Sequence, residues 1–197
     1  MLKVGLTGGI GGGKSTASSY FESLGAFIFD GDVEAKNLID ENKIVQAELI
    51  SEFGTDIIDG ANNIDKKKLA RVAFQDDNHQ QRLNSVVHPH VYEAIDLSFN
   101  KIFDKKEHKL FILDAAMIYE SGYDAHLDYV IVVTALIKNR MERALSRKTL
   151  SREEILSRID FQWPEEEKVD IADFVINNDG TEDDLKNHVD TIYSKLV

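Results

Sequence analysis

The chain has 197 residues, no cysteine and a formal net charge of −12. The acidic balance argues against a nucleic-acid partner, and the lack of cysteine excludes a disulfide framework and a cysteine-based zinc site. No apolar run approaches the ~20 residues of a membrane span and no signal-peptide pattern opens the chain, so we predict a cytoplasmic protein without a membrane partner.

Five short apolar runs predict the strands of a parallel β-sheet. They cover residues 2–7 (LKVGLT), 26–29 (AFIF), 109–114 (KLFILD), 129–134 (YVIVVT) and 173–177 (DFVIN). The runs are apolar throughout rather than alternating, which is typical of strands that helices cover on both faces. Helical patterns separate the runs, so the sequence predicts an α/β fold.

The helical patterns differ in length and charge. A first helix is expected after Lys14, the stretch from 33 to 106 reads as mostly helical with a break at Pro89, and a final helix covers Asp183–Leu196. A helical pair lies between residues 136 and 161, where basic residues outnumber acidic ones, and a turn at FQWPEEEK follows it. This basic island is either a local anion site or a solvated helix face.

A glycine-rich stretch, GLTGGIGGGKST, covers residues 5–16, from the end of the first predicted strand through a loop to the start of a helix. Gly8-x-x-x-x-Gly13-Lys14-Ser15 fits G-x-x-x-x-G-K-[ST] in the strand–loop–helix context that this motif requires. Glycines let backbone N–H groups turn toward phosphate oxygens, and a helix N-terminus adds positive potential. With Lys14 reaching the β- and γ-phosphates and Ser15 ligating Mg²⁺, the loop predicts binding of a nucleoside triphosphate.

Three acidic residues lie at or just after the ends of predicted strands. Asp30 and Asp32 follow the second strand, and the carboxyl ends of parallel strands face the ligand crevice, so either could accept a proton from an attacking hydroxyl. Asp32 could instead N-cap a helix beginning at Val33. Asp114 either supports a metal ion or caps a turn, and His88 either marks the helix break before Pro89 or contacts a substrate.

Several motifs together resemble the dephospho-coenzyme A kinase family. The likeness rests on the loop and its D-x-D, and on LNSVVHPHV, LDAAMIYESG, RALSRKTLSREEILSRIDFQWPEEEK and ADFVINNDG. It follows the family's order over nearly the full chain. The sequence departs from the family pattern at Gly31, Ala116–Ile118, Lys148 and Ile171.

The resemblance implies transfer of the γ-phosphate of ATP to the ribose 3′-hydroxyl of dephospho-CoA, the last step of coenzyme A biosynthesis, with Mg²⁺. It implies a P-loop NTPase core with a parallel five-stranded sheet (1–32, 107–136 and 170–197), a helical substrate-binding insert (33–106) and a helical lid (137–169). Another small-molecule P-loop kinase, with a nucleoside or shikimate-like acceptor, and a nucleotide-dependent switch are the alternatives.

The resemblance also implies roles for individual residues. The phosphates are expected at Gly11, Gly12, Gly13, Lys14, Ser15 and Thr16. Asp32 becomes the catalytic base, and Asp30 and His88 join it at the acceptor. Arg147 reaches the phosphates from the lid, and Asn177 and Asn178 lie near the adenine.

Overall fold

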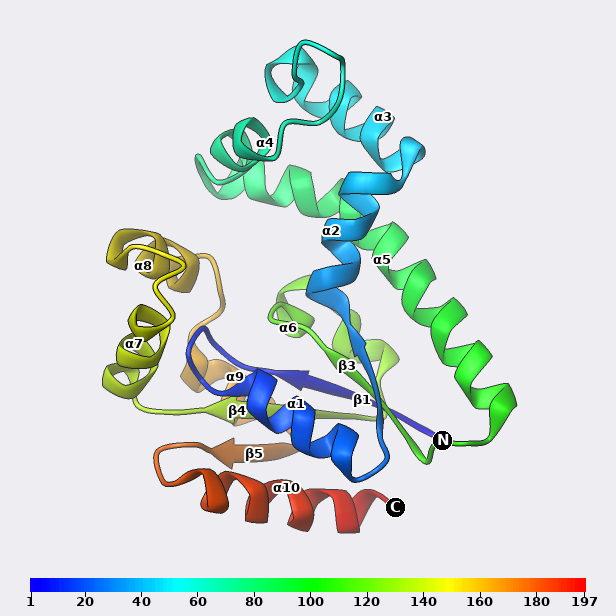
Figure 1. Cartoon of the computed structure of the whole chain (residues 1–197), viewed down its shortest axis with the longest axis vertical. Coiled ribbons are helices and arrows are strands. Elements are labelled where there is room, and N and C mark those ends of the chain that lie inside the picture. Colours follow the sequence, from blue (N-terminus) through cyan, green and yellow to red (C-terminus); the bar gives the residue numbers. More distant parts are fainter. The chain divides into compact units, whose positions relative to one another are not determined.

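The apolar runs form one five-stranded parallel sheet in the computed structural model, which describes residues 1–197. Its strands are β1 (Leu2–Thr7), β2 (Phe27–Asp30), β3 (Leu110–Asp114), β4 (Tyr129–Thr134) and β5 (Phe174–Asn177). Their order is β2-β3-β1-β4-β5, and every neighbouring pair is parallel. The predicted five-stranded parallel sheet is therefore confirmed (Figure 1).

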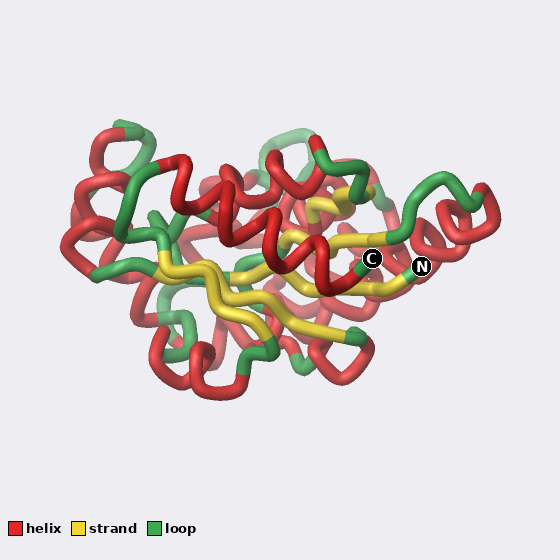
Figure 2. Tube along the Cα trace, turned by 90° about the horizontal axis from the view of Figure 1, so that it is seen from below, coloured by secondary structure: helices red, strands yellow, loops and turns green.

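The chain folds as two units, one of which contains the whole sheet. This unit comprises Met1–Asp30 and Ser98–Val197. Its helices are α1 (Lys14–Ser23), α6 (Ile118–Ser121), η2 (Tyr123–His126), α7 (Ile137–Ser146), α8 (Arg152–Asp160), α9 (Glu165–Ile171) and α10 (Glu182–Leu196). Figure 2 shows α10, which ends at the C-terminus, lying along the strands.

The core of this unit joins α1 and α10 to the sheet. Phe21 of α1 and Val189 of α10 are fully buried together with Val4, Leu6 and Ile131 of the strands. Burying a side chain of this size contributes roughly 1.5–3 kcal/mol. The apolar stripe of the last helix therefore holds the sheet and the helix that follows the glycine-rich loop in one core.

The second unit, Gly31–Leu97, is helical. It contains α2 (Gly31–Glu41), α3 (Lys43–Phe53), η1 (Gly54–Ile57), α4 (Lys66–Ala73) and most of α5 (Asp77–Lys105). Asn42 and Asp65 each accept two backbone N–H bonds at the starts of α3 and α4. Such N-caps explain where these helices begin. None of the helices of the structure combines the length and apolar character that crossing a membrane needs.

Three local expectations were wrong. Helix α5 runs through Pro89 without ending at His88, because one missing N–H removes a single hydrogen bond from a 29-residue helix. Helix α2 begins at Gly31, so Asp32 lies inside its first turn and does not cap a helix starting at Val33. The expected turn after Trp163 contains α9, which starts at Glu165 with three acidic residues that the helix dipole favours there.

Candidate active site

The glycine-rich loop is a tight connection between β1 and α1. Gly8, Gly11 and Gly13 have φ of +151°, +78° and +106°, values that side-chain-bearing residues rarely adopt. The Gly12 N–H donates to the Gly9 carbonyl at 2.9 Å, and the Thr16 N–H donates to the Gly13 carbonyl at 3.1 Å. The glycines therefore supply the backbone geometry that the motif predicted.

Neighbouring elements leave no room for side chains on this loop. A Cβ on Gly8 would overlap the Val133 carbonyl, and one on Gly11 would overlap the backbone of Arg140. Asn178, which is 8% exposed, donates from Nδ2 to the Gly12 carbonyl at 2.8 Å. The loop is thus held from outside by β4, α7 and the residue after β5.

Lys14, Ser15 and Thr16 form the first turn of α1. The Lys14 ammonium makes an ion pair with the Asp114 carboxylate, and these side chains are 19% and 8% exposed. Asp114 ends β3 and does not cap the next helix, α6, whose N-cap is Met117. The Ser15 side chain is exposed at the N-terminal end of the helix.

Strand register brings the predicted carboxylates of β2 and β3 to one edge. Asp30 pairs with Asp114, and Asp114 also lies opposite Leu6, just before the glycine-rich loop. Asp30 is exposed there. Asp32 follows two residues later in the first turn of α2, where it is half-buried.

His88 belongs to α5 within the helical unit. Its ring stacks on Tyr92 with the centroids 5.9 Å apart. Burial lowers the pKa of His88, so the imidazole is neutral at pH 7. A neutral ring offers one donor and one acceptor to a ligand rather than a charge.

The remaining predicted residues differ in their surroundings. Arg147 is exposed at the C-cap of α7. Asn177 is exposed and accepts the Asp179 N–H at 2.9 Å, whereas Asn178 is buried against the loop. The Asp179 carboxylate accepts the Leu136 N–H at 2.7 Å, a hydrogen bond that lowers the pKa of Asp179.

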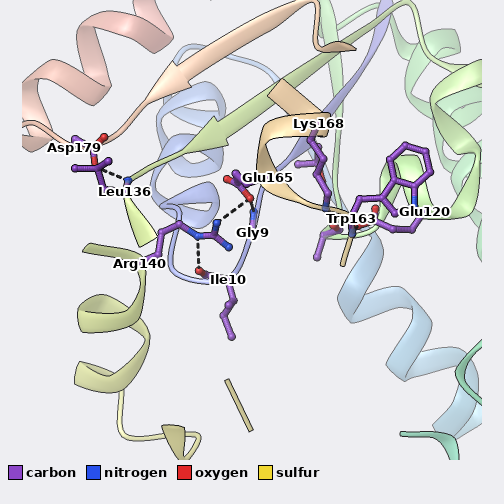
Figure 3. A network of polar contacts seen from close by, with 11 residues as sticks. Gly9, Ile10, Glu120, Leu136, Arg140, Trp163, Glu165, Lys168 and Asp179 are labelled. Carbon is purple, nitrogen blue, oxygen red and sulfur yellow. Dashed lines mark hydrogen bonds and ion pairs between the residues drawn. The ribbon is translucent and has the colours of Figure 1, made fainter. Parts of the chain in front are cut away.

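An ion pair beside the loop was missed from the sequence (Figure 3). Arg140 of α7 donates from Nε to the Ile10 carbonyl at 3.2 Å, and its Nη1 lies 3.1 Å from Glu165 Oε2. The same oxygen accepts the Gly9 N–H at 3.1 Å. No local signal marks these two residues, since Arg140 is one of many basic residues in its segment and Glu165 opens an acidic run.

A second missed ion pair anchors α9. Lys168 is fully buried and its Nζ lies 2.5 Å from Glu120 Oε1. That oxygen also accepts the backbone N–H of Trp163 at 2.9 Å, and the Trp163 ring stacks on Tyr119. Figure 3 shows Glu120, Trp163 and Lys168 grouped on one side of the loop network. Helix α9 is therefore tied both to the glycine-rich loop and to α6, which follows β3.

A parallel sheet whose first strand leads through this glycine-rich loop into a helix that opens with lysine and serine defines a P-loop nucleotide-binding protein. Residues 2–184 match the model of the dephospho-CoA kinase family. The chain belongs to the dephospho-CoA kinase family, whose members are ATP-dependent transferases of coenzyme A biosynthesis.

Individual relatives agree with the family model. A dephospho-CoA kinase of Corynebacterium glutamicum is 35% identical over 196 residues and covers both chains completely. One of Fusobacterium nucleatum is 37% identical over 190 residues, 96% of each chain. The crystal structure of TT1252 from Thermus thermophilus matches with a TM-score of 0.82 and 33% identity, over 100% of this chain and 98% of that one. Dephospho-CoA kinase from Campylobacter jejuni matches with a TM-score of 0.69 and 28% identity, over 98% and 96%.

These matches confirm the resemblance, the fold class and the kinase activity expected from the sequence. The roles given to single residues stay predictions. So do the Mg²⁺ ion, the boundaries of insert and lid, the absence of a nucleic-acid partner and the cytoplasmic location.

Proposed function

We propose that this chain transfers the γ-phosphate of ATP to the ribose 3′-hydroxyl of dephospho-CoA, releasing coenzyme A and ADP. The family match over residues 2–184 carries the proposal. An intact loop, with glycines at the positions where the backbone needs them, supports it.

The triphosphate would bind at Gly11–Thr16. Backbone N–H groups of the loop and the N-terminus of α1 supply donors and positive potential for phosphate oxygens. Lys14 is already ordered by Asp114, so little side-chain entropy is lost when its ammonium meets the β- and γ-phosphates. Asn177 and Asn178 would lie on the adenine side of the site.

Mg²⁺ fits the donors present. The exposed Ser15 hydroxyl and the Asp114 carboxylate are hard oxygen donors, the kind that Mg²⁺ prefers. When bound, the ion neutralises charge on the phosphates.

The acceptor would be activated by Asp32 and oriented by Asp30 and His88. A carboxylate can take the proton from the attacking hydroxyl, and the neutral His88 imidazole can hydrogen-bond to the acceptor. Arg147, exposed after α7, would meet the phosphates from the lid. Positioning and charge stabilisation then supply most of the catalysis.

The deciding experiment is turnover with ATP and dephospho-CoA as the only acceptor, followed by mass analysis. We expect ADP together with a product that carries one added phosphoryl group on the 3′-oxygen. Nucleosides and shikimate are tested in parallel. Faster phosphorylation of either would favour another small-molecule kinase, and slow ATP hydrolysis indifferent to dephospho-CoA would favour a switch protein.

Asp32→Asn tests the proposed base. The variant should bind ATP normally and lose phosphoryl transfer by about 10²–10⁴-fold, the usual contribution of a general base. Asp56→Asn, an exposed acid of the same helical unit, is the matched control. Near-normal turnover of Asp32→Asn would remove Asp32 from this role.

A further inference from the structure

We propose that Arg140 and Glu165 are positioning residues that hold the Gly9–Ile10 turn and thereby set the affinity of the loop for nucleotide phosphates. The inference rests on the proposed function, because phosphorylation of dephospho-CoA is the reaction whose kinetics test it. Neither residue needs to touch ATP. Both act through the backbone that leads into Gly11–Thr16.

The pair binds one backbone donor and one backbone acceptor of the turn. Glu165 Oε2 accepts the Gly9 N–H at 3.1 Å, while Arg140 Nε donates to the Ile10 carbonyl at 3.2 Å. The Arg140 and Glu165 side chains are only 6% and 14% exposed, so water competes weakly for these bonds. Charge-assisted hydrogen bonds of this kind are stronger than neutral ones.

Gly9 itself shows how closely the pair is fitted. It is not among the glycines with positive φ, so its backbone conformation does not require glycine. A Cβ at this position would overlap the Arg140 guanidinium and the Glu165 carboxylate, both flexible side-chain ends. Glycine at position 9 is therefore required by the ion pair rather than by the turn.

Movement of this turn reaches the phosphate-binding residues directly. The Gly12 N–H donates to the Gly9 carbonyl, so displacing Gly9 displaces Gly12 and the start of α1. Phosphate binding depends on N–H groups that already point at the anion before it arrives. Loss of the hydrogen bonds that the pair makes to Gly9 and Ile10 should therefore weaken nucleotide binding even though the motif residues are unchanged.

The pair also joins both ends of the segment that contains Arg147. Arg140 lies in α7 before this segment, and Glu165 is the first residue of α9 after it. Helix α9 is fixed further by the Lys168–Glu120 ion pair (Figure 3). The proposed lid therefore starts and ends at points that are bonded to the nucleotide loop.

The test compares Arg140→Gln and Glu165→Ala with wild type in steady-state kinetics. We expect the KM for ATP to rise about tenfold, while the KM for dephospho-CoA at saturating ATP changes by less than about threefold. Glu165→Gln keeps an oxygen that can accept the Gly9 N–H and should restore most of the ATP affinity. Two substitutions of exposed charges are the matched controls. Glu166→Ala removes the acid next to Glu165, and Lys186→Gln removes a base on α10.

Gly9→Ala provides an independent test. In the wild-type background it should raise the KM for ATP, because the new methyl group displaces the ion pair. In an Arg140→Ala background the same substitution should have a clearly smaller effect, since the overlapping guanidinium is gone. Equal effects in both backgrounds would overturn the proposal.

Binding of Mg²⁺-ADP by calorimetry separates this inference from the proposed function. Wild type that binds ADP but leaves dephospho-CoA unmodified would refute the function and leave the ion pair testable through ADP affinity. Arg140→Gln and Glu165→Ala that lower the melting temperature but bind ADP like the controls would refute the positioning role.

Discussion

Replacing Lys168 by Met should cost this protein a large part of its stability. The Lys168 side chain is fully buried, and its ammonium lies 2.5 Å from Glu120, which is 6% exposed. Methionine keeps the unbranched apolar stem of lysine, lacks the terminal ammonium and has no charge. The substitution therefore leaves the Glu120 carboxylate buried, with the Trp163 N–H as its remaining donor.

The magnitude follows from burial. At an effective dielectric constant of about 20, two unit charges separated by 2.5 Å attract by about 7 kcal/mol, most of which offsets desolvation in the intact pair. Removing one partner of a buried pair typically costs about 3–5 kcal/mol because the other charge is left uncompensated. Lys168 Nζ also donates to the Ala116 carbonyl at 3.4 Å, but this carbonyl keeps the Thr7 hydroxyl as a donor at 3.2 Å, so the loss centres on Glu120.

Urea unfolding followed by circular dichroism measures the effect. The single variant Lys168→Met should lower the free energy of unfolding by about 3–5 kcal/mol. The double variant Glu120→Gln/Lys168→Met should lower it by only about 1–2 kcal/mol, because the glutamine oxygen still accepts the backbone N–H of Trp163. Lys186→Met on the exposed face of α10 is the control. A single variant that loses less than about 1 kcal/mol, or a double variant as unstable as the single, would refute the reasoning.

Three further predictions follow from single contacts. Asn178→Ala removes the donor to the Gly12 carbonyl and should raise the KM for ATP about tenfold, with Asn187→Ala as control; an unchanged KM would contradict it. The pKa of Asp179 is lower in the folded chain than in the unfolded one, so its contribution to stability is complete above about pH 5 and disappears as the pH falls through its folded pKa. The stability difference between wild type and Asp179→Asn should therefore shrink from pH 7 to pH 3 in urea titrations, and a constant difference would disprove the assignment. Burial raises the pKa of Tyr119 to about 12, and its hydroxyl has no hydrogen-bond partner. Tyr119→Phe should therefore change the free energy of unfolding by less than about 0.5 kcal/mol. The substitution should also leave the ultraviolet phenol titration unchanged below pH 11.

Local patterns explain why most of the sheet unit could be predicted. Each strand is a continuous apolar run, and the glycine-rich motif lies wholly between β1 and α1. Where the signals conflicted, prediction failed. Pro89 signalled a break that the long helix α5 overrides, and Pro164 followed by three glutamates was interpreted as a turn although α9 starts there.

The sequence alone determined the parallel sheet, the phosphate-binding loop and the kinase family, because strand patterns and motifs consist of residues that are close together in the sequence. Tertiary structure decided which charged groups meet. The sequence left Asp114 as a metal ligand or a cap, and only strand order showed that its carboxylate lies against Lys14. Arg140 and Glu165 had no signal at all, since the two residues that they join, Gly9 and Ile10, lie more than a hundred positions away. A charged side chain does not specify its partner, and only the packing of α7 and α9 beside the loop does so.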